Sequence, residues 1–442
     1  MNGLLRYARQ TALLATTSVA GLSAYKHGHE YVVDKKEKDH SSTTSYNSAN
    51  VSFPSSTRTS CEPCKINASS KGEVHVRVPS SKPGTKLLFL GSGSSTGCPK
   101  PVCAITFPES NELRNKNPMV KLQKDLEAKC KISRIANVGD PRFNKNYRNN
   151  PSLLISHRNN DSDVSVSDQD NSAHEHEKEL KNVIIDVGKT FREGALRWMP
   201  HHGIYHLDSI VLTHEHADAF LGLDDLRGFQ IARHMISSDG TTSGVPNMSL
   251  PVYLSPKCFE TIKQAFGYLV PKELTEQVKS INTKKGGPKV VRHVAALDFQ
   301  KVQHFKPFFA AGLKMIPLPV IHGEDFICNG YAFSVKGDMG RTVNVLYLSD
   351  ISRMLPETEQ FILEKLPPTD ILVVDSLLYE RDHSVHYSLD QALDLVERLG
   401  PKKTYLVGMN CDDFPEHDEA NIVIRSRNPT VELAHDGLVV EL

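Results

Sequence analysis

Residues 210–218 read Ile-Val-Leu-Thr-His-Glu-His-Ala-Asp, so an apolar run typical of a buried strand leads directly into two histidines and an aspartate. Alternate residues of an extended or turning segment share a face, so we expect His214, His216 and Asp218 to point into one small volume. Imidazole and carboxylate ligands suit Zn²⁺, Mn²⁺ or Fe²⁺. Histidine pairs also occur in solvated turns, so this motif alone leaves both interpretations open.

Two later strand ends favour the metal interpretation. His322 follows the apolar run 315–321, Met-Ile-Pro-Leu-Pro-Val-Ile, and Asp350 closes the run 343–350, Val-Asn-Val-Leu-Tyr-Leu-Ser-Asp. Strand ends are where α/β enzymes place the residues of their sites. A metal ion held there by few protein ligands keeps coordination positions for an activated water.

The order of these motifs resembles the metallo-β-lactamase superfamily of hydrolases. Three further stretches are similar to the branch that contains phosphoribosyl cyclic phosphodiesterases and tRNA 3′-processing endonucleases. They are Leu-Gly-Ser-Gly-Ser-Ser-Thr-Gly at 90–97, Gly-Leu-Asp-Asp-Leu-Arg at 222–227 and His-Ser-Val-His-Tyr-Ser at 383–388. The resemblance covers residues 86–442.

The resemblance implies an α/β fold, a four-layer αββα sandwich of two sheets flanked by helices. It implies a catalytic metal ion, Zn²⁺ with Mn²⁺ or Fe²⁺ as alternatives. The implied metal ligands are His214, His216, Asp218, His322 and Asp350. Asp218 would also orient or deprotonate the attacking water, and His386 would meet the substrate phosphate or the leaving group.

Two positions depart from the family pattern. The family has a second His after the motif aspartate, where this chain has Ala219, and a His after the strand 404–407, where it has Gly408. Both missing imidazoles belong to the second metal of a binuclear site, so we expect one catalytic ion. Asp224 and Asp225 are alternative ligands, but acidic residues also favour the first turn of a helix.

The composition is typical of a globular enzyme. The 442 residues have 39% hydrophobic content and a formal net charge of +0, so net charge predicts no broad nucleic-acid-binding surface. We therefore expect a metal-dependent phosphodiesterase whose partner is a small or cyclic phosphodiester. The alternatives are a tRNA 3′-end nuclease, with RNA as partner, and a non-catalytic metal-binding descendant. A homodimer is compatible with this interpretation.

The N-terminal part differs in composition from the rest. Residues 1–29 contain Arg6, Arg9 and Lys26 and no acidic residue, which is typical of a mitochondrial presequence; a weak anchor or a disordered tail is the alternative. A cytoplasmic or nuclear location would follow from the tail, and we expect no stable membrane insertion. Residues 30–85 are predicted to be a low-complexity linker, residues 86–442 the hydrolase domain, and residues near 159–181 a disordered insertion.

Eight scattered cysteines argue against a disulfide framework. By the resemblance, Cys98, Cys103, Cys130 and Cys411 are candidates for a separate structural zinc site, with buried free thiols as the alternative. The Gly/Ser turn at 91–97 either cradles a phosphate or makes a tight strand connection. Arg148 is a candidate phosphate contact.

Overall fold

The computed structural model describes residues 84–104, 130–158, 180–230, 234–236, 242–244, 249–271 and 294–442. All of them belong to one of the two units into which the chain divides, residues 66–442. The predicted targeting segment 1–29, the linker up to residue 83 and residues 159–179 of the predicted insertion lie outside the described residues. Thr85, the last residue of the predicted linker, is buried in the folded unit. Its backbone N–H donates to Asp338 Oδ1 at 3.1 Å.

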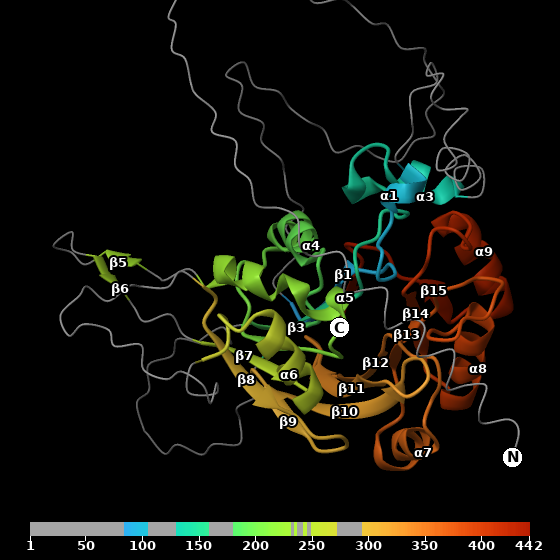
Figure 1. Cartoon of the computed structure of the whole chain (residues 1–442). Coiled ribbons are helices and arrows are strands. Elements are labelled where there is room, and N and C mark those ends of the chain that lie inside the picture. The colour runs from blue at the N-terminus through green and yellow to red at the C-terminus, as the bar shows by residue number, and fades with distance from the viewer. Residues whose placement is uncertain are drawn as a thin grey trace, which may run out of the picture. The chain divides into compact units, whose positions relative to one another are not determined.

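Two seven-stranded mixed sheets form the centre of this unit (Figure 1). The first sheet has the order β16-β1-β2-β3-β4-β7-β8, and the second has the order β15-β14-β13-β12-β11-β10-β9. The strands of the first sheet are β1 (Lys86–Gly91), β2 (Ser152–Arg158), β3 (Leu180–Ile185), β4 (Ser209–Val211), β7 (Leu250–Leu254), β8 (Leu297–Lys301) and β16 (Val439–Glu441). Those of the second are β9 (Phe308–Ala310), β10 (Leu313–Ile321), β11 (Ile327–Lys336), β12 (Thr342–Leu348), β13 (Ile371–Asp375), β14 (Lys403–Val407) and β15 (Val431–Leu433). A short hairpin of β5 (His234–Ile236) and β6 (Thr242–Gly244) stands apart from both sheets.

Strand alternation divides the core into layers. In β1, Leu87 and Phe89 pack between the two sheets, whereas Leu88 and Leu90 face the helices on the outer side. Because both faces of each sheet are covered, strands such as β1 and β13 read as continuous apolar runs. The predicted four-layer αββα sandwich is confirmed.

Helices cover the outer face of each sheet (Figure 1). The core of the first sheet includes side chains of α4 (Phe191–Trp198) and α6 (Pro256–Ala265), and that of the second includes α7 (Pro356–Lys365), α8 (Leu389–Leu399) and α9 (His417–Arg427). The shorter helices are α1 (Pro101–Ala104), α3 (Lys131–Ala136), α5 (Ala217–Phe220), η2 (Pro141–Phe143), η3 (Pro200–His202) and η4 (Leu221–Phe229). Among the described residues, no helix is both long and apolar enough to cross a membrane.

Strand direction brings the ends of several strands to one edge of the sandwich. Strands β10 and β12 are both antiparallel to β11, so they run in the same direction, and β12, β13 and β14 are mutually parallel. In the first sheet, β3 and β4 are parallel. The two sheets meet near these ends, because the Asn329 N–H donates to the Thr213 carbonyl oxygen at 3.0 Å and the Tyr331 hydroxyl donates to the Leu212 carbonyl oxygen at 2.6 Å.

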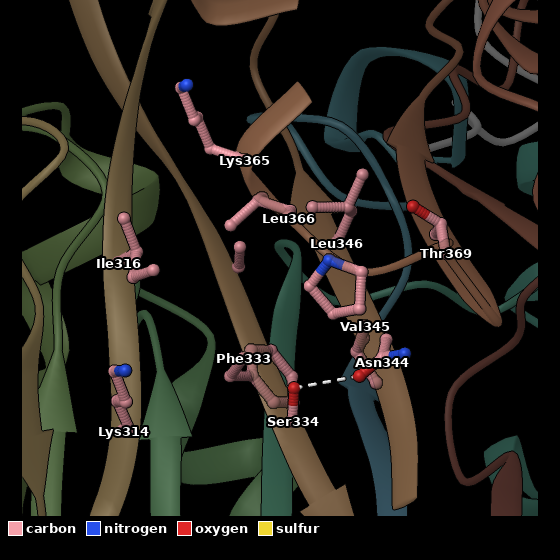
Figure 2. A pocket seen from close by; sticks show the side chains of 12 residues that line it. Lys314, Ile316, Phe333, Ser334, Asn344, Val345, Leu346, Lys365, Leu366 and Thr369 are labelled. Atoms are coloured by element: carbon pink, nitrogen blue, oxygen red, sulfur yellow. Dashed lines mark hydrogen bonds between the residues drawn. The ribbon is translucent and has the colours of Figure 1, made fainter. Parts of the chain in front are cut away.

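A cavity of about 190 Å³ lies elsewhere, against β10, β11, β12 and the end of α7 (Figure 2). Its lining is apolar, including Ile316 and Leu346, with Lys314 and Lys365 also contributing. Ser334 Oγ donates to Asn344 Oδ1 at 2.9 Å across two of these strands. The described residues that line this cavity include none of the predicted metal ligands, so the chemistry is expected at the strand-end edge instead.

Candidate metal centre

His214 is held by a chain of hydrogen bonds that leaves one ring nitrogen free. The Asp186 carboxylate accepts the Thr213 N–H at 2.8 Å and the Thr213 hydroxyl at 2.7 Å, and Thr213 Oγ1 lies 2.8 Å from His214 Nδ1. Because the hydroxyl donates to Asp186, its oxygen accepts the Nδ1 proton, and the lone pair falls on Nε2. His214 Nε2 is buried without a hydrogen-bond partner. A buried, unpaired acceptor of this kind suits a metal ion.

Burial also keeps this imidazole neutral. It lowers the pKa of His214 to about 3, the largest effect on that side chain. Only the neutral imidazole binds a metal ion, so His214 needs no proton release to act as a ligand.

Asp186 adopts a left-handed backbone conformation with φ 62°, a conformation that is costly for a non-glycine residue and that clusters at functional sites.

His216 and His322 face the same point. The His322 Nδ1 lies 2.7 Å from the Val385 carbonyl oxygen, which can only accept, so Nδ1 is protonated and Nε2 carries the lone pair. That Nε2 lies 3.3 Å from His216 Nδ1. Two nitrogens that are each about 2.0–2.1 Å from one tetrahedral zinc ion lie roughly 3.3–3.4 Å apart. The ligand atoms of His214, His216 and His322 all lie within 4.8 Å of one another.

Two predicted carboxylate ligands lie beside these imidazoles. Asp350, with φ 54°, forms a second group with His322 and His386 whose ligand atoms also lie within 4.8 Å of one another. Asp218, in α5, is buried and belongs to neither group. Burial raises the pKa of Asp218, and the nearby Asp350 carboxylate raises it further, so the two carboxylates share one environment.

His386 forms a close pair with Asp375, at the end of β13. The Nδ1 atom of His386 lies 2.6 Å from Asp375 Oδ2 and 3.9 Å from Asp350 Oδ1. Burial alone lowers the pKa of His386, but the Asp375 carboxylate more than offsets this and raises it to about 9. Sequence reasoning identified His386 and missed Asp375, although Asp375, like Asp350, is an acidic residue at a strand end.

Gly408 has a local reason for lacking a side chain. Its φ is 84°, and a Cβ atom built there would lie 2.2 Å from Asp375 Oδ1. The Asp375 carboxylate therefore occupies the space into which a histidine at position 408 would enter. A side chain at position 408 would therefore require the Asp375 carboxylate, which pairs with His386, to move.

The alternative ligands Asp224 and Asp225 are not among the groups of described residues with converging ligand atoms. Asp224 lies in the first turn of η4, and its Oδ2 lies 3.4 Å from Arg227 Nη2. For Asp224, the interpretation as an acidic residue in a helical first turn is the one that the structure supports.

Comparison with known proteins assigns the chain to a family. A family model described as "Beta-lactamase superfamily domain" matches residues 181–409, a range that contains every imidazole and carboxylate of the centre. The chain belongs to the metallo-β-lactamase superfamily. The fold of this superfamily implies a bound divalent metal ion, and the converging ligand set fits one.

Individual relatives cover different parts of this chain. An octanoyltransferase of Porphyromonas gingivalis is 28% identical over 258 residues, which is 58% of this chain and 42% of that protein, so the chain spans less than half of the relative's length. The crystal structure of a diphosphatase from the PhnP family is 26% identical, with a TM-score of 0.50, and the match covers 81% of this chain and 98% of that one. Zn²⁺-bound PqqB from Methylobacterium extorquens, 13% identical with a TM-score of 0.50 over 81% of this chain and all of that one, shows the fold alone.

The Gly/Ser turn at 91–97 is a tight strand connection. A Cβ on Gly91 would lie 1.8 Å from the Asn150 carbonyl oxygen. The N–H groups of Ser92 and Gly93 donate to Asp436 Oδ1 at 2.9 Å and to the Asn149 carbonyl oxygen at 2.7 Å. Since these N–H groups are already paired, the structural interpretation of the turn is favoured over a phosphate cradle.

The prediction that Arg148 contacts phosphate is wrong. Its side chain is fully buried, and its three guanidinium nitrogens have no hydrogen-bond partner. Burial lowers the pKa of Arg148, while the nearby Cys98 and Asp436 raise it. The sequence showed a basic residue in an Asn/Arg-rich segment but not the direction of its side chain.

The four candidate cysteines form one buried cluster. The sulfur atoms of Cys103, Cys130 and Cys411 lie within 4.8 Å of one another, and Cys98 packs in the same cluster. Burial raises the pKa of Cys103 to about 11, so its thiol stays protonated at neutral pH unless a cation replaces the proton. Converging sulfur ligands fit zinc and exclude hard cations such as Mg²⁺.

Proposed function

We propose that this metallo-β-lactamase superfamily chain is a metal-dependent phosphodiesterase that hydrolyses a small or cyclic phosphodiester. One observation carries the proposal: three imidazoles converge beside Asp350, and a separate His386–Asp375 pair faces the same space. The similarity to a diphosphatase at 26% identity supports phosphorus as the reacting atom. The balanced net charge favours a small substrate over a polymer such as RNA.

His214, His216, His322 and Asp350 are the residues that would hold the ion, with zinc as the expected metal and Mn²⁺ or Fe²⁺ as alternatives. When bound, such an ion lowers the pKa of water and polarises a phosphoryl oxygen. Asp218 is a second carboxylate at the site, near Asp350. The mixed imidazole and carboxylate set leaves room for substrate, because His216 is exposed whereas His214 and His322 are buried.

Two side chains would then move protons. Asp218 accepts a proton from the attacking water while the oxygen of that water bonds to phosphorus. His386 donates a proton to the departing alkoxide as the bond between phosphorus and that oxygen breaks. A linear diester gives a phosphomonoester and an alcohol, and a cyclic diester opens to a phosphomonoester with a free hydroxyl on the same molecule. Asp375 holds the Nδ1 side of His386, which leaves Nε2 as the ring nitrogen that would donate this proton.

We propose further that the cysteine cluster holds a structural zinc ion, as the family resemblance implies. Its sulfurs are buried, and the converging ligand atoms that the described residues provide there are those of Cys103, Cys130 and Cys411. A closed set of soft ligands is typical of structural rather than catalytic zinc.

The test uses the full chain loaded with Zn²⁺ or Mn²⁺ and three substrates: bis(p-nitrophenyl) phosphate, a cyclic ribose phosphodiester and a precursor tRNA with a 3′ trailer. We expect turnover of the two small diesters and none of the tRNA. The matched variant is His386→Ala, which should retain the metal and lose turnover. Cleavage of the precursor tRNA alone would establish the nuclease alternative, and a fully loaded chain that turns over none of the three would establish the non-catalytic alternative.

A further inference from the structure

Phe326 contacts all three ligand imidazoles. It lies in the turn between β10 and β11, and its backbone carbonyl accepts the His322 N–H at 2.8 Å. Its ring stacks on His216 with a centroid distance of 4.6 Å and an interplanar angle of 23°. It meets His214 and His322 edge to face, at 5.9 Å and 5.8 Å. A half-buried aromatic ring therefore covers one side of the candidate metal centre.

His216 differs from the other histidines in what holds it. Hydrogen bonds to non-ligand groups fix the rings of His214, through Thr213, and of His322, through the Val385 carbonyl. For His216, the hydrogen bonds of the described residues provide only the contact with His322, itself a candidate ligand. A ligand imidazole normally donates its second N–H to a fixed partner that orients the ring. For His216, the stacked ring of Phe326 takes the role of this orienting partner.

A charged pair secures Phe326 in turn. The Lys257 Nζ, on α6, lies 4.1 Å from the centroid of the Phe326 ring and 2.8 Å from Glu215 Oε1. Glu215 is the residue between the two motif histidines. A cation over an aromatic face is attractive, so Lys257 ties the β10–β11 turn to the histidine motif through both contacts. Cys258, next to Lys257, donates from Sγ to the His214 carbonyl oxygen at 3.4 Å, which fixes the start of α6 against the same loop.

We propose that Phe326 is a positioning residue that orients His216 for metal binding by stacking, with Lys257 holding the ring in place. The proposal rests on the metal site proposed above. It predicts that affinity for the catalytic ion depends on an aromatic ring at position 326, although no atom of that ring is a ligand. Removing an outer partner of a ligand typically weakens metal binding about 10–100-fold.

The experiment measures Zn²⁺ affinity by chelator competition in the full chain, with the His322→Ala variant defining the binding that remains at the cysteine cluster. Phe326→Leu, which keeps an apolar side chain, should raise the Kd of the histidine site about tenfold. Phe326→Trp should restore the affinity to within about threefold of the wild type, since an indole also stacks. Lys257→Met should have a smaller effect than Phe326→Leu, because it removes only the support of the ring.

The matched control is Phe309→Leu in β9, because Phe309 is an exposed aromatic side chain that contacts none of the three imidazoles. Circular dichroism of each metal-free variant would confirm that it folds. An unchanged Kd in Phe326→Leu, or a loss in Phe326→Leu that Phe326→Trp fails to restore, would overturn the stacking role. If wild type and His322→Ala bind the same number of ions, the proposed metal site fails, and the role of Phe326 fails with it.

Discussion

The histidine cluster and the cysteine cluster are both rich in metal ligands, but they are built differently. His214, His322 and Asp350 follow strands that end at one edge of the sandwich, and the site combines buried imidazoles with an exposed one and two carboxylates. The cysteines come from loops and short helices, and Cys98, Cys103, Cys130 and Cys411 are all buried, each with 2% exposure or less. The first arrangement leaves access for a substrate, whereas the second closes around its own sulfurs.

This difference predicts that the ion of the histidine cluster serves catalysis and that the ion of the cysteine cluster stabilises the fold. An ion with open positions and neighbouring proton carriers can activate water, and an ion enclosed by soft ligands holds segments of the chain together. The cysteine cluster joins residues 98–103, 130 and 411, which are far apart in the sequence. Loss of the first ion should therefore stop turnover and leave the fold, and loss of the second should weaken the fold first.

Removal of a histidine ligand should have the largest effect on activity. The wild type should bind two Zn²⁺ per chain, His322→Ala one and Cys411→Ser one, because each change removes a ligand of a different site. His322→Ala should abolish turnover of bis(p-nitrophenyl) phosphate. Elemental analysis of purified chains checks the counts, with His201→Ala as the matched control because the described His201 lies outside both clusters. Two ions in His322→Ala would contradict the assignment.

Removal of the proposed proton donor, His386, should have the next largest effect on activity. His386→Ala should keep its metal and lower kcat about 100- to 10,000-fold, the usual contribution of general acid catalysis. Asp375→Asn should lower kcat less, since the imidazole remains and only its partner changes. Steady-state kinetics beside metal analysis separates these outcomes, and His383→Ala, the neighbouring exposed histidine, serves as control. A His386→Ala enzyme with unchanged kcat would exclude the proposed role.

Loss of the cysteine cluster should show in stability. Cys411→Ser should lower the thermal midpoint by roughly 10 °C, because a structural ion and its links between distant segments are lost. The control is Cys328→Ser, which changes another fully buried thiol outside the cluster and should cost less. Addition of a strong chelator should lower the midpoint of the wild type and leave that of Cys411→Ser unchanged. Equal responses of both chains to the chelator would speak against a structural ion.

The smallest effect is expected at Gly408, which lies between the two clusters, beside Asp375 and three residues before Cys411. Gly408→Ala should reduce the free energy of unfolding by about 2 kcal/mol more than Gly400→Ala. Both glycines have positive φ, but a Cβ at Gly400 would meet nothing within 4 Å. The difference between the two variants, measured by urea unfolding, isolates the contact with Asp375. Equal losses would indicate that the Asp375 carboxylate moves away at no cost.

The strand-end residues could be predicted because each follows an apolar run that is visible in the chain. The resemblance to the superfamily made the sandwich predictable, and apolar runs such as 210–212 agree with strands that are buried on both faces. The pairing of Asp375 with His386 could not be predicted, because it depends on how the loop after β13 folds back. The stack of Phe326 on His216 and the inward direction of Arg148 likewise depend on packing between elements that are distant in sequence.

One feature of the first sheet bears on how the chain folds during synthesis. Strand β1 pairs with β16, with Lys86 opposite Glu441 and Leu88 opposite Val439. Until residues 439–441 have been synthesised and have left the ribosome, one side of β1 presents unpaired N–H and C=O groups, which are a template for aggregation. Closing so long a loop is entropically costly and slow. The nascent chain should therefore complete its first sheet only after β16 has emerged, and chaperones that shield exposed strand edges should act on it before that step.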